Sequence, residues 1–323
     1  MGTSVASRVA PEIRSVQERK FAALMRRVLE QNAFYRSKFE PAGLRPGKPA
    51  GLSVREHLPY TRRGELLADQ RAHPPLGTNL SFPAGRYTRL HEETLPDGQG
   101  LVWADTAESW RAWLDCWCEL YRKCGVTAED RVLVAASEKA APAFRAAADA
   151  AAELGALALG PAWTARRAAD WLRHRPTAVV LPAETAVEIA AAAGGSSGRE
   201  IRLVLAVTGR DLAAVEEREA VAAAWRAECR VLPSSVELGS FGWDCGRREG
   251  VHLLETELVA EVVDPDSLSP ATPDASGRVR GELVLTTLWR EGSPVIRYLT
   301  GTRVVLDRSP CPCGARTAVV RPL

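Results

Sequence analysis

The chain has 323 residues, of which 25% are charged and 46% hydrophobic, a composition typical of a globular protein with a full apolar core. Its 42 basic and 40 acidic residues leave a formal net charge of +2, so the charge gives no reason to expect nucleic acid or an anionic membrane as a partner. No apolar run reaches the roughly 18 to 20 residues of a membrane-spanning helix, and the N-terminus lacks the apolar segment of a signal peptide. We therefore expect a cytoplasmic protein.

The first eighty residues are predicted to form helices and connecting loops, because apolar side chains recur there at helical spacing. The residues at this spacing are Phe21, Leu24, Met25, Val28 and Leu29. A second amphipathic helix is predicted from Asp105 to Cys124, with Trp110, Trp113 and Trp117 along one stripe.

A regular alternation of apolar runs and alanine-rich stretches follows. The apolar runs, predicted to be strands, are residues 132–136, 156–159, 178–181 and 201–207. The alanine-rich stretches, predicted to be helices, are residues 141–154, 164–174, 184–193 and 210–227. Strands that alternate with helices of this length form a parallel sheet covered on both faces, so the predicted fold class is α/β.

After about residue 232 the pattern changes to strands without intervening helices. The predicted strands are residues 251–254, 258–263, 279–287, 295–299 and 303–306. We therefore predict a helical lead-in with a parallel α/β subdomain over residues 1–232. A smaller β-rich subdomain is predicted over residues 233–323.

Four segments carry a recognisable pattern: NAFYRSKFEPAG at 32–43, LPYTRRGEL at 58–66, GELVLTTLWREGSPVIRY at 281–298 and CPCG at 311–314. In this order they resemble the phenylacetate–coenzyme A ligase family of the adenylate-forming superfamily. The resemblance implies the large N-terminal domain of such an enzyme. The family also has a C-terminal lid domain with a catalytic lysine. We expect that domain to be absent, because the sequence ends at Leu323 and has no lysine after Lys139.

The family's phosphate-binding loop follows R-I-H and reads A-S-S-G-T-T-G-K-P. In the same register this chain has RLH at 89–91, followed by Glu92, Glu93, Thr94, Leu95, Pro96, Asp97, Gly98, Gln99 and Gly100. Gly98 is retained, Thr94 stands for a serine, and Gln99 replaces the lysine. Three carboxylates would lie where a triphosphate binds, and like charges at that range repel. We therefore do not expect ATP with magnesium to bind.

Two further nucleotide-binding motifs differ from the family pattern. Where the family has Y-G-x-S-E, PSSVE at 233–237 keeps Glu237 as a vestigial cofactor-binding residue, and Pro233 replaces the stacking tyrosine. Where the family has R-Y-R-T-R-D, RYLTGT at 297–302 places Thr302 at the ribose-binding aspartate, and one hydroxyl cannot replace two acceptor oxygens. The preferred interpretations are a solvated or capping glutamate for Glu237 and a structural ion-pair partner for Arg297.

The cysteines predict a metal site. Cys245 and His252 lie in DCGRREGVH, which resembles the family's E-C-x-x-x-x-G-x-H, and Cys311 and Cys313 form C-x-C before Gly314. Three cysteines and a histidine match a closed, tetrahedral, structural zinc site. The alternative is two unrelated pairs of reduced side chains. Buried free thiols are predicted at Cys116, Cys118 and Cys124.

Three functions remain open. The first is a non-adenylating scaffold or binding protein for an acyl group, an acyl-CoA, an intact ligase or a carrier protein. The second is acyl transfer without ATP in the retained acyl pocket, although Ser137, Ser234 and Ser235 lack an assignable histidine, and His91 is better interpreted as structural. The third is a ligase completed by a partner subunit, against which the acidic loop argues. The resemblance also implies a homodimer.

Overall fold

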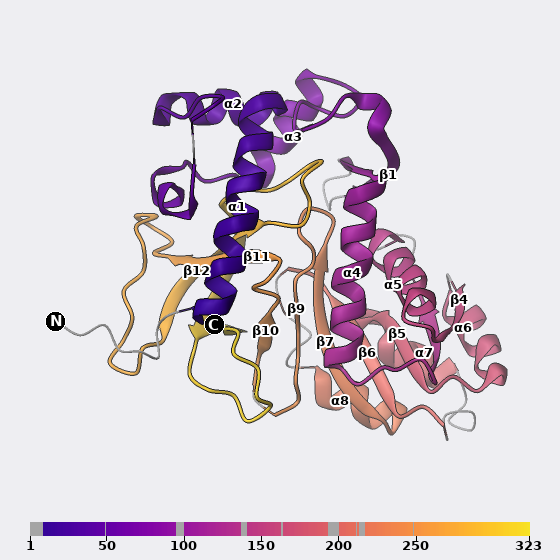
Figure 1. The fold of residues 1–323 in the computed structure, drawn as a ribbon. Helices are drawn as coiled ribbons and strands as arrows, with labels where there is room; N and C mark the ends of the chain where they lie inside the picture. Colours follow the sequence, from indigo (N-terminus) through magenta and orange to yellow (C-terminus); the bar gives the residue numbers. More distant parts are fainter. Residues whose placement is uncertain are drawn as a thin grey trace.

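The structure is a computed structural model that describes residues 9–48, 50–94, 100–136, 141–162, 164–192, 200–210, 212, 217–247 and 249–323 (Figure 1). The helices are α1 (Pro11–Gln31), α2 (Ala33–Phe39), α3 (Arg63–Ala72), α4 (Ala107–Lys123), α5 (Ala141–Glu153), α6 (Ala165–Trp171), α7 (Ala186–Ala192) and α8 (Arg218–Trp225). The strands up to β7 are β1 (Tyr87–Thr94), β2 (Gly100–Thr106), β3 (Arg131–Ala135), β4 (Leu157–Ala162), β5 (Ala178–Pro182), β6 (Leu203–Thr208) and β7 (Glu228–Ser235). The later strands are β8 (Gly239–Ser240), β9 (Gly242–Trp243), β10 (Val251–Leu253), β11 (Leu258–Val263), β12 (Val279–Thr287), β13 (Tyr298–Asp307) and β14 (Val319–Pro322).

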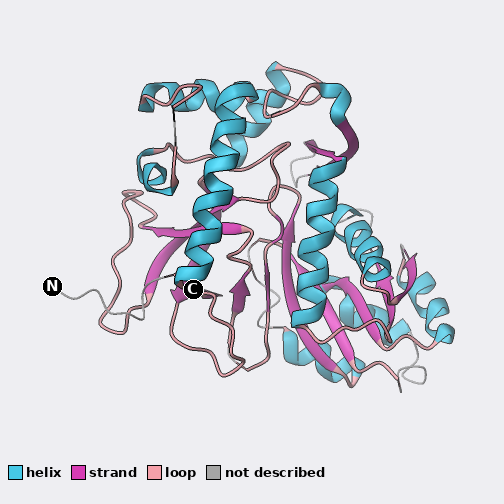
Figure 2. Ribbon diagram, in the orientation of Figure 1, coloured by secondary structure: helices cyan, strands magenta, loops and turns pink. Residues whose placement is uncertain are grey.

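The central part of the chain forms a parallel sheet in the order β4-β3-β5-β6-β7, to which the short β8 adds one antiparallel strand. Figure 2 shows helices on both sides of this sheet. On β3, Val132 and Val134 pack in the apolar cluster of α4 and α5, whereas Leu133 and Ala135 pack in the cluster of α6, α7 and α8. Successive residues of a strand face opposite sides, so a sheet covered twice needs continuous apolar runs. The predicted α/β fold class is confirmed.

The C-terminal part forms an antiparallel sheet in the order β11-β12-β13-β14-β10-β9. The long helix α1 packs near β11 and β12 in Figure 1, and its buried stripe includes Phe21, Leu24 and Met25. These side chains share an apolar cluster with Val259 of β11. The Gln17 side chain of the same helix donates hydrogen bonds to the carbonyl oxygens of residues 255 and 258, at 3.0 and 2.9 Å. The N-terminal helix that the sequence predicts is therefore anchored to the β-rich part.

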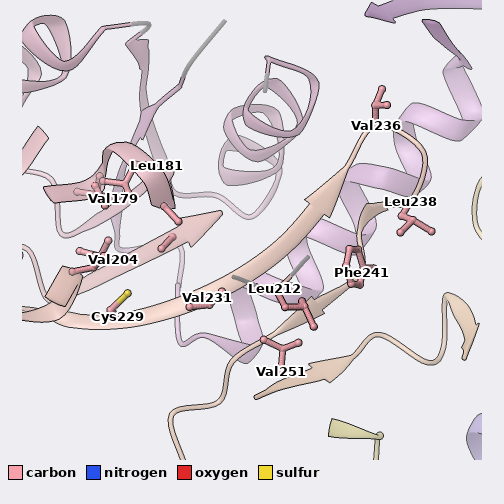
Figure 3. Packing of buried hydrophobic residues seen from close by; sticks show 14 of the residues in the cluster. Val179, Leu181, Val204, Leu212, Cys229, Val231, Val236, Leu238, Phe241 and Val251 are labelled. Carbon is pink, nitrogen blue, oxygen red and sulfur yellow. The ribbon is translucent and has the colours of Figure 1, made fainter. Parts of the chain in front are cut away.

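One apolar cluster joins the two sheets. It contains Val179 of β5, Val204 of β6 and Val231 of β7, and continues to Val251 of β10 (Figure 3). Leu283 of β12 belongs to the same cluster. Burying a side chain of this size contributes about 1.5–3 kcal/mol. This shared apolar core fixes the strands that line the pocket described below.

Two predictions about strands need correction. The predicted strands 295–299 and 303–306 are one strand, β13, which begins at Tyr298 and continues through a bulge opposite Glu282 and Val284. Gly301 has φ 77° within this strand, a conformation that glycine adopts without a steric penalty, so the chain bends without ending the strand. The hairpin of β1 and β2 was not predicted, because charged residues interrupt its apolar alternation.

The predicted division between residues 232 and 233 lies within β7, which runs from Glu228 to Ser235. The division into two subdomains stays a prediction. Among the described residues, no helix is both long enough and apolar enough to cross a membrane.

Candidate functional site

A pocket of about 570 Å³ opens at the carboxyl ends of three neighbouring parallel strands. β5 ends at Pro182, β6 at Thr208 and β7 at Ser235, and all three residues line the pocket. Ligand sites in open α/β sheets lie at this edge. The pocket's apolar lining includes Trp113, Ala143, Val207 and Val236. Among the described residues, its charged lining is formed by Arg63, Glu92, Glu93, Glu184 and Arg210.

Glu237 lies directly behind this lining and is completely buried. Its Oε1 is 2.6 Å from Arg63 Nη2 and 3.6 Å from Arg210 Nη1, and it accepts a 2.6 Å hydrogen bond from the Tyr298 hydroxyl. Burial acts to raise the pKa of the Glu237 carboxyl, but Arg63, Tyr298 and Arg210 outweigh burial and hold that pKa below its ordinary value. The interpretation as a solvated glutamate is therefore wrong. The other oxygen, Oε2, has no hydrogen-bond partner among the described residues.

The two glutamates predicted to disable the phosphate loop lie on β1 and line the pocket. Glu93 pairs with Arg63 Nη2 at 3.2 Å, and burial, followed by the charge of Glu237, raises the pKa of the Glu93 carboxyl. Glu92 is exposed. Several residues discussed from the sequence lie outside the described ones: Leu95, Pro96, Asp97, Gly98, Gln99 and Ser137.

Thr302 lines the pocket and donates a 2.8 Å hydrogen bond from Oγ1 to the carbonyl oxygen of Arg210. Arg297 lies elsewhere: its guanidinium pairs with Glu261 at 3.0 Å and covers the Tyr60 ring at 4.0 Å. The predicted role of Arg297 as a structural ion-pair partner is confirmed.

A second buried charge network lies between β1, β2 and the segment after β12. Asp105 and Arg290 are both fully buried and bind each other through two hydrogen bonds, one of them 2.7 Å from Arg290 Nε to Asp105 Oδ1. His91 Nε2 is 3.2 Å from Asp105 Oδ2, so His91 is the structural histidine that the sequence suggests. Burial acts to raise the pKa of Asp105, but Arg290 and His91 hold that pKa at about 2. The Arg290 guanidinium lies 5.2 to 5.3 Å from the ring centroids of Trp103, Trp113 and Trp289.

The sequence did not predict this network, because Asp105 and Arg290 are 185 positions apart. The nearest signal is the arginine at position 290, which follows a tryptophan inside the segment that resembles the family.

The structure brings together all four predicted metal ligands. Cys245 follows β9, His252 lies on β10, and Cys311 and Cys313 lie between β13 and β14. Their ligand atoms lie within 4.8 Å of one another, with 3.7 Å between the Sγ atoms of Cys245 and Cys311 and 3.4 Å from Cys313 Sγ to His252 Nε2. A tetrahedral zinc ion with Zn–S bonds of about 2.3 Å has an S···S separation of about 3.8 Å. The donor set could therefore hold a metal ion.

The second nitrogen of the histidine supports this geometry. His252 Nδ1 lies 3.1 Å from Thr317 Oγ1 and 3.3 Å from the Thr317 carbonyl oxygen, a partner that leaves Nε2 directed at the thiols. Burial raises the pKa of the Cys245 thiol to about 11, whereas the Ala315 N–H and the neighbouring thiols lower the pKa of Cys313 against the effect of its burial.

The remaining cysteines are buried and free, as predicted for three of them: Cys116, Cys118, Cys124 and Cys229. Burial raises the pKa of each of these thiols, so they stay protonated and unreactive near neutral pH. Cys229, on β7, was not singled out from the sequence.

No protein-family model matches the chain. A phenylacetate–coenzyme A ligase from Thermus thermophilus is 26% identical over 310 residues, which are 94% of this chain and 68% of that ligase. The open conformation of 2-hydroxyisobutyryl-CoA ligase in complex with 2-HIB-AMP and CoA is similar, with a TM-score of 0.85 and 21% identity over 97% of this chain and 74% of that chain. The postadenylation state with R3-HIB-AMP has a TM-score of 0.84 at 22% identity, over 97% of this chain and 67% of that chain.

Proposed function

We propose that this phenylacetate–coenzyme A ligase-like chain, which has the acid–CoA ligase fold, is a binding protein that does not activate carboxylates with ATP. The observation that carries the proposal is the charge of the pocket at the carboxyl ends of β5, β6 and β7. Three glutamates line this pocket, and a fourth, Glu237, lies behind it.

The two cations of the described pocket lining are already engaged. Arg63 pairs with Glu237 and Glu93, and Arg210 is 3.6 Å from Glu237 while its Nε donates a 2.8 Å hydrogen bond to the Thr300 carbonyl oxygen. Phosphoryl transfer from ATP needs free cations and N–H donors around the phosphates, because negative charge accumulates on the phosphate oxygens. Here a polyphosphate would meet the carboxylates of Glu92, Glu93 and Glu184, while the two described cations of the lining are engaged with other groups. The pocket therefore disfavours ATP electrostatically.

The carboxylate of Glu237 is also poorly placed to bind a magnesium ion. A magnesium ion could bind Glu237 Oε1 only by displacing Arg63, whose Nη2 lies 2.6 Å from that atom, and Oε2, which has no partner among the described residues, is enclosed. Both groups are held in place, since Glu237 is fully buried and also accepts the hydrogen bond from Tyr298. Among the residues that the structure describes, the pocket does not match the nucleotide–magnesium site that the resemblance implies.

The test is a calorimetric titration with ATP and magnesium, together with carboxylate-dependent pyrophosphate exchange across aromatic and fatty acids. We expect no saturable ATP binding and no exchange above background. An active acid–CoA ligase assayed in parallel shows that the assay conditions are adequate. Saturable ATP binding accompanied by exchange would contradict the proposal.

We include in this proposal a structural zinc ion held by Cys245, His252, Cys311 and Cys313. The donor set has four ligands, so no position stays open for a substrate. When bound, the ion would cross-link the turn after β9, strand β10 and the segment between β13 and β14. Zinc thus serves the β-rich part as a cross-link.

Acyl transfer without ATP is less favoured. Ser234 and Ser235 line the pocket, and Ser234 Oγ has the Ser240 hydroxyl 3.3 Å away. No histidine is among the described residues that line the pocket, so neither serine has a base to activate it there. The partners expected from the sequence, which are an intact ligase, a carrier protein, an acyl-CoA or a second copy of the chain, stay proposals.

A further inference from the structure

The cluster of Cys245, His252, Cys311 and Cys313 has a thiol at the molecular surface, and we propose that it is also a site of oxidative modification. At this site hydrogen peroxide joins Cys313 to Cys245 in a disulfide, and the zinc ion is released. The release of zinc rests on the proposed function, whereas the disulfide needs the thiols alone. The inference adds a reversible redox reaction to a site whose proposed role above is structural.

The turn C-P-C-G at 311–314 places its two thiols at different depths. The Gly314 N–H donates a 2.9 Å hydrogen bond to the Cys311 carbonyl oxygen, so these four residues form a tight turn with Pro312 at its second position. Cys311 is buried, with 7% of its surface exposed, whereas Cys313 is exposed. The turn therefore presents one thiol of the cluster to solvent and withholds the other.

Access to solvent separates Cys313 from the thiols outside the cluster. Those four cysteines are all buried: Cys116, Cys118, Cys124 and Cys229. A small oxidant in water reaches exposed sulfur first, and it reacts with thiolates rather than with thiols. A zinc ion, when bound, holds its sulfur ligands as thiolates. Cys313 is therefore the sulfur that peroxide oxidises first.

Cys245 is the thiol that completes the disulfide. The ligand atoms of the cluster lie within 4.8 Å of one another, so side-chain rotation can bring Cys245 Sγ to the bonding distance of about 2.05 Å from Cys313 Sγ. Cys245 is partly exposed and follows β9, in a segment separate from the turn. Cys311 is a poorer partner for Cys313, because the ring of Pro312 between them restricts the backbone of the turn. The disulfide therefore links two segments.

The reaction has two steps and needs no oxidant besides the peroxide. The Cys313 thiolate attacks one oxygen of hydrogen peroxide; an S–O bond forms, the O–O bond breaks and hydroxide leaves, which gives a sulfenic acid. The Cys245 thiolate then attacks this sulfur, so that the S–S bond forms, the S–O bond breaks and a second hydroxide leaves. The two sulfurs together lose two electrons, which the peroxide gains, and solvent protons convert the hydroxides to water. Cys311 and His252 alone do not retain the ion.

The disulfide replaces the cross-link that the ion would provide. Both connect the turn after β9 to the segment between β13 and β14. β13 also carries Thr300 and Thr302 of the pocket lining. A cross-link between the same two segments constrains the unfolded chain in either form, so the β-rich part keeps much of its stability when the ion is lost.

The experiment treats the full, reduced chain, purified with its zinc, with a small excess of hydrogen peroxide. A chromogenic chelator measures released zinc, a thiol reagent in denaturant counts free thiols, and mass spectrometry of peptides identifies the disulfide. We expect the thiol count to fall by two for each zinc ion released, a disulfide between Cys245 and Cys313, and full reversal by dithiothreitol with added zinc. The oxidised chain should melt at a higher temperature than the reduced chain treated with a chelator.

Cys313→Ser should slow the reaction with peroxide about 10-fold, because the remaining sulfurs of the cluster are less accessible. Cys118→Ser removes a buried thiol on α4, and this matched control should react like the wild type. Since Cys313→Ser also removes a metal ligand, the peptide map of the wild-type chain decides the pair even where that variant folds poorly.

Four results would overturn the inference: the cluster thiols stay reduced, the disulfide joins Cys245 to Cys311, Cys313→Ser reacts at the wild-type rate, or the oxidised chain melts no higher than the chelated one. A chain purified without metal would end the proposed zinc site, while the peptide map would still decide the disulfide.

Discussion

Replacing Cys311 with serine tests the proposed zinc site most directly. Cys311 Sγ is buried and lies 3.7 Å from Cys245 Sγ, close to the separation of two thiolates on one zinc ion. A serine keeps the size of the side chain but stays a protonated hydroxyl, which is a poor zinc ligand. The purified wild-type chain should carry about one zinc ion, and the variant should carry almost none.

The expected loss of stability follows from the length of chain that the ion closes. Cys245 and Cys311 are 66 residues apart, and a cross-link over a loop of that length contributes about 4 kcal/mol through the lost entropy of the unfolded chain. With an unfolding entropy of about 2.1 cal/mol/K per residue, this free energy corresponds to a fall in melting temperature of roughly 6 °C for a chain of this size. Chelation of the wild-type protein should give a similar fall, since metal binding and folding are coupled.

The assay is metal analysis of protein purified without chelator, followed by thermal unfolding with and without a chelator. Cys118→Ser is the control: Cys118 is equally buried, lies on α4, and donates from its thiol to the Ala150 carbonyl oxygen. That variant should keep its zinc. A wild-type preparation that is free of metal and fully stable would refute the site, and so would a Cys311→Ser variant that retains zinc.

The remaining predictions concern the buried pair of Asp105 and Arg290. Asp105→Asn should lower the free energy of unfolding by about 3–5 kcal/mol, measured by urea denaturation, because it leaves a buried guanidinium without its counter-charge. Glu108→Gln removes a carboxylate from an exposed arginine pair and should change stability little; an equal loss in both variants would contradict this reasoning. The pKa of Asp105 is lowered from 3.8 to about 2, so its contribution to stability is present above about pH 3.8 and is lost as the pH falls through about 2. The difference in stability between wild type and Asp105→Asn should therefore shrink across that window, and a constant difference would exclude Asp105 as its source.

The charge of the pocket combines what the sequence predicts with what the fold adds. The register of RLH at 89–91 predicts carboxylates at the phosphate loop, and the structure places Glu92 and Glu93 on the pocket wall. The sequence could not predict that Arg63 is already paired, since its partner Glu237 is 174 positions away. The structure also overturned the interpretation of Glu237 as a solvated side chain, because Glu237 is fully buried and its arginine partners keep it ionised.

Local patterns of the sequence determined the α/β fold class, the amphipathic helices and the four positions of the Cys/His cluster. These features depend on periodicity and on spacing over a few residues, which a sequence displays directly. The tertiary structure alone decided the continuous strand β13, the hairpin of β1 and β2, and the pairing of Asp105 with Arg290. Each of these features depends on contacts between segments that are distant in the sequence and on the burial that these contacts produce. Such contacts arise from the packing of the whole chain, and no local pattern specifies them.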